Sequence, residues 1–239
     1  MTCETKEQLR ELYRRWKREA ETVCPEFFSK NEIYSNPYYS SVPEGWNDDA
    51  YPRIMIVGEE GFGTWGCGKG DGSISANEIE KIQLLNFDYL KRQLYELPAG
   101  GGNNSAFWKR FRKISKYGVC CWTNIDKIHA LRNKNCALAE KDRKRLHSVT
   151  TRILYEEIAI LNPTHVVFFG WHRHSLQHEL PELYAMLYPN GPKDNHIWSK
   201  NVVSLQVEGR RYIFSYHPNW GYRNAGYEDK VIEALQKSL

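Results

Sequence analysis

Short apolar runs alternate along this chain with longer segments in which apolar residues recur every three or four positions. Four of the runs have the length and composition of buried strands: 54–57, 118–123, 165–169 and 211–215. The segment 202–207 is expected to pair antiparallel with the last of them through a turn at 208–210. Strands that alternate with helices are typical of a parallel sheet with helices on both faces. The pattern therefore predicts an α/β fold, a three-layer α/β/α sandwich whose central, mainly parallel sheet has about four core strands.

The segments with helical spacing fall between these strands. They cover 4–21, 75–97, 139–161 and 226–239, and a further helix is expected to start after Asn104 or Ser105. Both residue types are good helix N-caps, because their side chains accept a hydrogen bond from an amide of the first turn. No linker or repeat divides the chain. We therefore expect one domain over 1–239, with 1–50 forming a helical and loop extension that packs on it.

The composition is that of an ordinary folded protein of 239 residues, with 41% hydrophobic and 26% charged residues. No segment has the unbroken apolar length of a membrane-spanning helix, and the first residues lack the apolar core of a secretion signal. We therefore expect no membrane contact and a cytoplasmic protein, or a nuclear one in a nucleated cell. The six cysteines form no Cys-x-x-Cys pair, and no ligand set has convincing spacing, so neither a metal nor another cofactor is expected.

The net charge of +4 is only mildly basic, but three local clusters of basic residues occur at 14–18, 109–113 and 141–145. Such clusters suit a polyanionic partner, although a charge run on a helix is more often a solvated face. Charge alone leaves nucleic-acid binding open.

Two loops carry most of the candidate chemistry. The strand at 54–57 runs into Gly58-Glu59-Glu60-Gly61-Phe62, and the strand at 211–215 runs into Tyr216-His217-Pro218-Asn219. Ligands of open α/β sheets bind beyond the carboxyl ends of the strands, so the two loops are expected to frame one site. A carboxylate and an imidazole there suit hydrolysis of a bond whose leaving group needs charge stabilisation. The alternative is a turn with solvated acids and a structural histidine.

A third candidate follows the strand at 118–123. Asn124 falls at the end of that strand, and its amide offers an acceptor and two donors, which is what reading the N3–H and O4 edge of a pyrimidine requires. An asparagine in such a loop is otherwise most often a turn former. Near the chain end, Trp220 and Tyr222 stand beside Arg223, a combination that suits insertion into a stack of bases.

The three loops, in this order, resemble the uracil-DNA glycosylase superfamily. The segment 53–66 looks like its first motif, 123–127 is similar to its Thr-Asn-x-x-Lys segment, and 216–219 is similar to its His-Pro-Ser motif. The helix, proline and glycine-terminated strand at 156–170 also resemble the family. Gly61 stands in place of the usual proline and Asn219 in place of the usual serine. Ile128 stands where iron–sulfur members carry a cysteine, so no cluster is expected.

The resemblance implies a monofunctional DNA glycosylase that flips a uracil-like or modified pyrimidine out of DNA and hydrolyses its N-glycosidic bond. Its catalytic residues would be Glu60, which positions water, and His217, which stabilises the leaving base, with Glu59 as a substitute for Glu60. The resemblance also implies a larger set of residues that bind the base and the DNA. The base would be bound by Asn124, Phe62, Gly58, Gly61 and Trp65, and single- or double-stranded DNA by Asn219, Trp220, Tyr222, Arg223 and Lys127 of a monomer.

Three alternatives stay open from the sequence. The first is a glycosylase that removes bulky modified phage bases in antiviral defence, for which the glycine-rich stretch 63–72 leaves room. The second is a nucleic-acid-binding module of the same fold without catalysis. The third is an unrelated hydrolase that processes free nucleosides or nucleotides. The identity of the base and the choice between repair and defence are open as well.

Overall fold

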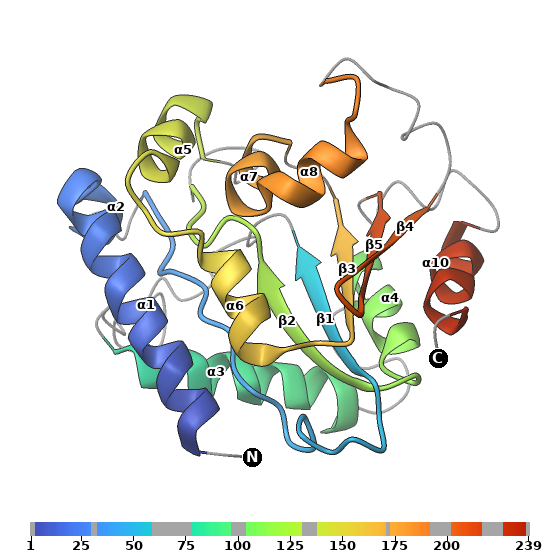
Figure 1. Ribbon diagram of the computed structural model, residues 1–239. Helices are drawn as coiled ribbons and strands as arrows, with labels where there is room; N and C mark the ends of the chain where they lie inside the picture. Colours follow the sequence, from blue (N-terminus) through green and yellow to red (C-terminus); the bar gives the residue numbers. More distant parts are fainter. Residues whose placement is uncertain are drawn as a thin grey trace.

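The structure is a computed structural model that describes residues 3–29, 33–58, 78–96, 104–130, 138–170, 173–191, 202–216 and 227–237. Its centre is a five-stranded sheet in the order β2-β1-β3-β5-β4 (Figure 1). The strands are β1 (Arg53–Gly58), β2 (Val119–Asn124), β3 (His165–Phe169), β4 (Val203–Val207) and β5 (Arg210–Ser215). Four of them are parallel, and β4 pairs antiparallel with β5 at one edge. The predicted α/β/α sandwich with a mainly parallel sheet is confirmed, as is the antiparallel pair at its edge.

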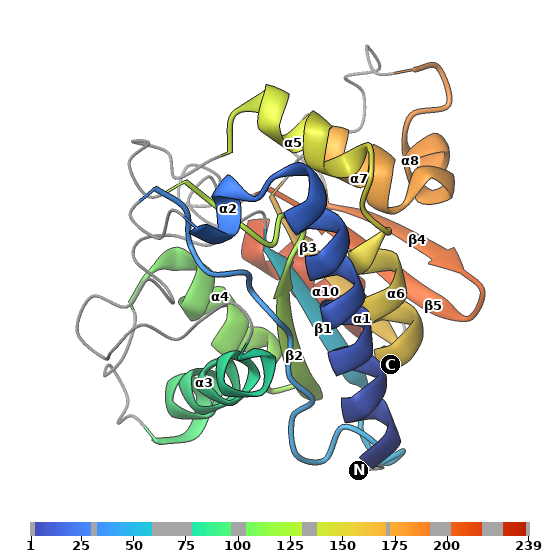
Figure 2. The same ribbon diagram turned by 90° about the vertical axis from the view of Figure 1, so that its left-hand side faces the viewer.

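Helices cover both faces of the sheet (Figure 2). One face packs against α1 (Cys3–Val23) and α6 (Ile153–Leu161), and α2 (Glu26–Ser29), α5 (Glu140–His147), α7 (Arg173–Glu179) and α8 (Pro181–Leu187) complete this side. The other face packs against α4 (Ala106–Ile114) and α10 (Tyr227–Gln236), and α3 (Ile79–Lys91) continues into a π-helical turn, Arg92–Glu96. Among the described helices, none combines the length and apolar character needed to cross a membrane.

Alternation along the strands explains the two cores. In β1, Met55 and Val57 join the core under α1 and α6, whereas Ile54 and Ile56 join the core under α4 and α10. All four side chains are buried, as expected for a strand with helices on both faces. A sheet covered on both sides leaves its strand ends as the place where polar loops can gather.

Two local predictions are confirmed by the geometry of the backbone. The Ser105 side chain accepts a hydrogen bond from the amide of Trp108, 3.4 Å away, and caps α4. Glu208 and Gly209 join β4 to β5 with φ values of 49° and 77°. Positive φ at both central positions is the requirement of a type I′ hairpin turn, and glycine takes that conformation without strain.

The predicted single helix over 139–161 is wrong, because the chain breaks into α5 and α6. The hydroxyl of Thr150 donates to the carbonyl of Leu146, 3.0 Å away, which gives that backbone oxygen a side-chain partner. The amide of Thr151 donates instead to the carboxylate of Glu19 on α1, 2.5 Å away. The break therefore depends on an acceptor from a distant part of the chain, which no local pattern shows.

Candidate active site at the carboxyl edge of the sheet

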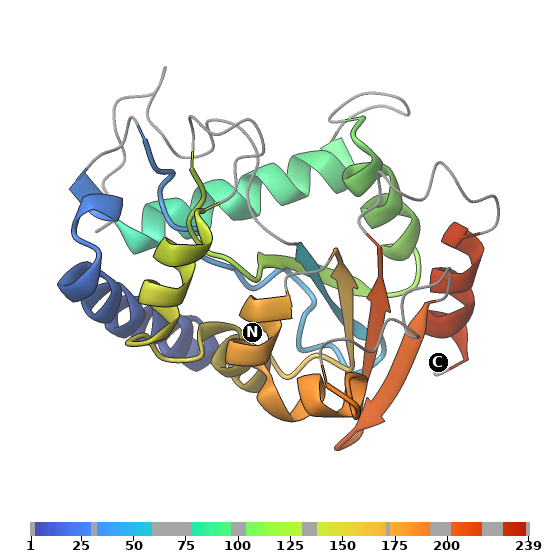
Figure 3. The same ribbon diagram turned by 90° about the horizontal axis from the view of Figure 1, so that it is seen from above.

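The carboxyl ends of β1, β2, β3 and β5 lie along one edge of the sheet, which faces the viewer in Figure 3. The register places Gly58 opposite Asn124 on one side and opposite Phe169 on the other, and Phe169 opposite Ser215. From β1 the chain passes to β2 on one side and then to β3 on the other. In open α/β sheets, such a change of direction creates the crevice in which ligands bind.

Asn124 places a buried amide at this edge of the sheet. It is 1% exposed, and its Oδ1 accepts a hydrogen bond from the indole Nε1 of Trp122 at 3.2 Å. Within the described part of the chain, its Nδ2 is buried and has no hydrogen-bond partner. A buried polar group without a partner costs about 1–3 kcal/mol, so a folded protein seldom keeps one without a reason. The amide of Asn124 is therefore poised to donate to a ligand.

Gly58 makes room for this amide. A Cβ atom at position 58 would lie 2.7 Å from Oδ1 of Asn124, closer than carbon and oxygen approach. The carbonyl of Gly58 accepts from the amide of Ile125 at 2.9 Å, so the two strand ends are also joined just beyond the sheet. A side chain at position 58 would therefore displace the Asn124 amide from the place that it holds beside Gly58.

Aromatic rings surround the same position. Phe107, half-buried at the start of α4, lies 5.7 Å from Trp122 and 5.4 Å from Phe169 between ring centroids. The would-be Cβ of Gly58 is 3.5 Å from Phe107, so this ring borders the Gly58–Asn124 pair. The sequence does not single out Phe107, which falls in the helix predicted to start after Asn104 or Ser105. Its place in the first helical turn after the Ser105 cap is the one signal that could have set it apart, because that end of α4 lies at the carboxyl edge.

Arg110 was also missed. It is 2% exposed, its guanidinium lies 5.5 Å from the centre of the Phe169 ring, and its Nη1 donates to the carbonyl of Tyr216 at 3.4 Å. One buried cation thus links α4, the end of β3 and the segment that leaves β5 just before His217. A positive charge in these surroundings is screened little by water, so it favours negative charge nearby.

The structure corrects the prediction for Lys127, which was expected to contact DNA. Its side chain is 1% exposed, and its ammonium lies 2.6 Å from Oε2 of Glu157 and also donates to the hydroxyl of Thr123. Glu157, wholly buried on α6, accepts further hydrogen bonds from the hydroxyls of Thr123 and Tyr13, at 2.9 and 2.8 Å. Lys127 therefore anchors the segment after Asn124 to α1 and α6 and does not reach a DNA backbone.

A second buried pair holds the same segment. Asp126 accepts from Nε of Arg143 on α5 at 2.9 Å and from the hydroxyl of Ser175 on α7 at 2.8 Å. Asp126 and Lys127 are both nearly inaccessible to water, so each charge is balanced by a specific partner. Two buried ion pairs within three residues of Asn124 fix the backbone that presents its amide.

Next to these pairs lies a buried carboxyl group. Glu179, 2% exposed on α7, accepts a hydrogen bond from the amide of Leu154 at 2.7 Å. Burial raises the pKa of Glu179 to about 8. Burial also lowers the pKa of His178, whose ring stacks on that of His147 at 4.4 Å between centroids. The folded protein therefore keeps a proton on Glu179 at pH values where an exposed glutamate has lost it.

Replacing Glu179 with glutamine is expected to flatten the dependence of stability on pH. The unfolded chain releases the proton near pH 4.5 and the folded chain near pH 8, so the stabilisation from this group is complete at low pH and falls as pH rises through this window. The loss approaches about 1.4 kcal/mol per pH unit. Urea unfolding between pH 5 and 9 measures it. Glu179→Gln should be the more stable protein at pH 9, whereas Glu182→Gln, at a side chain 74% exposed, should follow the parent. Parallel curves for parent and Glu179→Gln would refute the assignment.

Ten predicted site residues lie outside the residues that the structure describes: Glu59, Glu60, Gly61, Phe62, Trp65, His217, Asn219, Trp220, Tyr222 and Arg223. The structure does place the points from which their segments start, Gly58 and Tyr216, at the same edge of the sheet.

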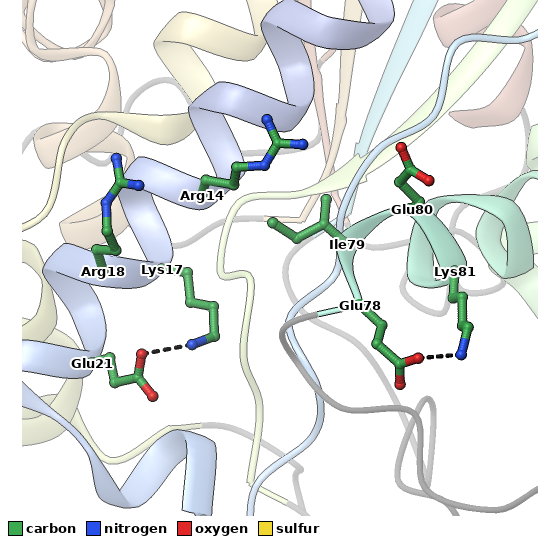
Figure 4. Close-up of a pocket in the computed structure, with 8 residues that line it drawn as sticks. All are labelled: Arg14, Lys17, Arg18, Glu21, Glu78, Ile79, Glu80 and Lys81. Atoms are coloured by element: carbon green, nitrogen blue, oxygen red, sulfur yellow. Dashed lines mark hydrogen bonds and ion pairs between the residues drawn. The ribbon is translucent and has the colours of Figure 1, made fainter.

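The described part of the chain also contains buried thiols and a second hollow. In the described ranges, no group of three or more His, Cys, Asp or Glu side chains is arranged to hold a metal ion, and Cys24, Cys120 and Cys121 are buried free thiols. A cavity of about 550 Å³ lies between α1 and the start of α3 (Figure 4). Its lining carries both signs of charge, much of it paired, as in the ion pair of Lys17 with Glu21 at 2.6 Å and that of Lys81 with Glu78. Such a lining selects no particular class of ligand.

No protein-family model matches the chain, and neither does any curated protein. The function proposed below therefore depends on the chain's own residues and on the order of its motifs.

Proposed function

We propose that this protein is a monofunctional DNA glycosylase, which hydrolyses the N-glycosidic bond of a flipped-out uracil-like or modified pyrimidine and leaves an abasic site. The observation that carries the proposal is Asn124: a buried amide at the carboxyl edge of the sheet, beside Gly58 and Phe107, whose Nδ2 has no partner among the residues that the structure describes. A pyrimidine edge offers the acceptor that this amide lacks, and the neighbouring aromatic ring suits the face of a base.

Cleavage of the bond leaves a sugar with positive charge at C1′ and a base with negative charge, and both need stabilisation. In the proposed reaction Glu60 orients the attacking water and faces the sugar, with Glu59 as its possible substitute, and His217 donates a hydrogen bond to the departing base. The segments that carry them start at Gly58 and Tyr216, on the edge that holds Asn124. The buried guanidinium of Arg110, bonded to the carbonyl of Tyr216, adds positive charge behind this edge.

Further residues would hold the base and the DNA around it. Phe62, Gly61 and Trp65 would bound the base, and Trp220 or Tyr222 would fill the gap that it leaves in the duplex, with Asn219 and Arg223 on the backbone. Lys127 has no part in this, because its ammonium is paired inside the protein. We further propose that the protein acts as a monomer, in the cytoplasm or, in a nucleated cell, in the nucleus.

The test is an assay for abasic sites. Purified protein is incubated with oligonucleotides that carry one uracil, hydroxymethyluracil or mismatched thymine, as single and double strands, and with modified phage DNA. Alkali then cleaves the strand at each abasic site. We expect cleavage at one or more of these bases, and none before alkali, since a monofunctional enzyme leaves the strand intact. Binding of DNA without base release would indicate a binding module, and activity on free nucleosides alone would indicate a different hydrolase.

A further inference from the structure

The hydrogen bond between Trp122 and Asn124 determines which atom of the amide faces which way. The nitrogen and oxygen of an asparagine amide have nearly the same shape, so an isolated side chain could present either one to a ligand. An indole N–H can only donate, and its partner must therefore be the amide oxygen. Here Nε1 of Trp122 lies 3.2 Å from Oδ1 of Asn124, and Nδ2, which no described residue pairs with, is left for the ligand.

Trp122 is itself held in place. Its ring lies 4.4 Å from that of Tyr38 and 5.2 Å from that of Trp108 between centroids. Its carbonyl accepts from the hydroxyl of Ser40 at 3.2 Å. A flip of the Asn124 amide would set its NH₂ group against the indole N–H and leave that partly buried donor without an acceptor, which is unfavourable. The indole therefore allows one orientation of the amide.

We infer that Trp122 is the specificity-determining residue of this site: it locks the Asn124 amide in the orientation that selects an imide edge, as in uracil and its derivatives, over the edge of cytosine. Nδ2 donates to the carbonyl O4 of the base, and the second lone pair of Oδ1 accepts N3–H. Cytosine presents an amino group and an unprotonated N3 at the same positions, so donor meets donor and acceptor meets acceptor. The inference rests on the proposed function and goes beyond it by naming the class of base and the residue that imposes it.

The experiment removes the indole N–H and retains the ring. Trp122→Phe is the simple variant, and replacement of Trp122 with 3-benzothienylalanine, in which sulfur takes the place of N–H, keeps the bicyclic shape if phenylalanine unfolds the protein. Trp16→Phe is the matched control, because it makes the same change in a buried tryptophan of the core on the opposite face of the sheet from Trp122. Two quantities are measured: kcat/KM for release of uracil and of cytosine from otherwise identical oligonucleotides, and the affinity of the protein for free uracil and free cytosine.

We expect the parent to prefer uracil in both measurements, and the preference to fall at least about tenfold when the indole N–H is lost, since one bidentate base contact discriminates by about that much or more. The Trp16→Phe control should keep the parent ratio. A parent that does not distinguish the bases, or a benzothienyl variant with the full preference, would overturn the inference. If no base is released from DNA but free uracil still binds better than cytosine through Trp122, the proposed function fails and the assignment of Trp122 stands.

Discussion

His217→Ala and Glu60→Gln are each expected to slow base release about a hundredfold, which is typical for the loss of one oriented polar group at a reacting centre. Alanine removes the donor to the departing base, and glutamine keeps the size of Glu60 while removing the charge that faces the sugar cation. The measurement is the single-turnover rate of abasic-site formation in a uracil-containing oligonucleotide. We expect the temperature of unfolding to stay that of the parent, so that a slower rate can be assigned to the chemical step.

Glu59→Gln is the matched control for the carboxylate, since it makes the same change one residue earlier. If Glu60 positions the water, Glu59→Gln should retain most of the parent rate, and a reversed pattern would move the role to Glu59. Base release at the parent rate in both His217→Ala and Glu60→Gln would show that the chemistry is carried by other residues.

Lys127→Met is expected to destabilise the protein by about 3–5 kcal/mol, because it leaves the carboxylate of Glu157 buried without its cation. For a chain of this length, such a loss lowers the temperature of unfolding by roughly 10 °C, as thermal unfolding would show. The control is Lys144→Met. Lys144 lies 2.6 Å from Glu140, the same distance that separates Lys127 from Glu157, but both partners are more than half exposed. Exposed pairs contribute about 1 kcal/mol or less, so this variant should unfold close to the parent.

The second half of this experiment adds Glu157→Gln. If the ion pair is responsible, the double variant Lys127→Met, Glu157→Gln should be more stable than the sum of the two single losses predicts, because the first change leaves a charge that the second removes. Strict additivity, or a loss in Lys127→Met no larger than in Lys144→Met, would argue that Lys127 contributes only packing.

Much of the fold follows from local pattern. The runs at 54–57 and 166–169 are apolar on both faces, as expected for a strand with helices on both sides, and Gly209 permits a tight turn between β4 and β5. The break between α5 and α6 could not be predicted in this way. The acceptor for the amide of Thr151 is Glu19, 132 residues earlier in the chain, and no window of the sequence contains both.

Some features of the candidate site could likewise be predicted from the sequence, and others could not. That Asn124 lies beside Gly58 follows from two neighbouring parallel strands that end together. That Lys127 points inward does not follow, since a lysine in a polar loop is usually solvated. Its partner, Glu157, is the second of two adjacent acids in a largely apolar helix, and only the placement of that helix against β2 shows which of the two forms the buried ion pair.

The sequence by itself determined the order of strands and helices, the edge of the sheet at which polar residues gather, and the residue types available there. These depend on spacing and backbone conformation, which act between near neighbours. The tertiary structure alone decided that Phe107 and Arg110 stand at that edge, that Lys127 is buried, and that the amide of Asn124 is held by Trp122. Most of these contacts join segments that are far apart in the sequence. The hydrogen bond from Trp122 to Asn124 is local, but Tyr38 and Trp108 hold the indole ring that donates it. All of these contacts therefore form only after the helices have packed on the sheet.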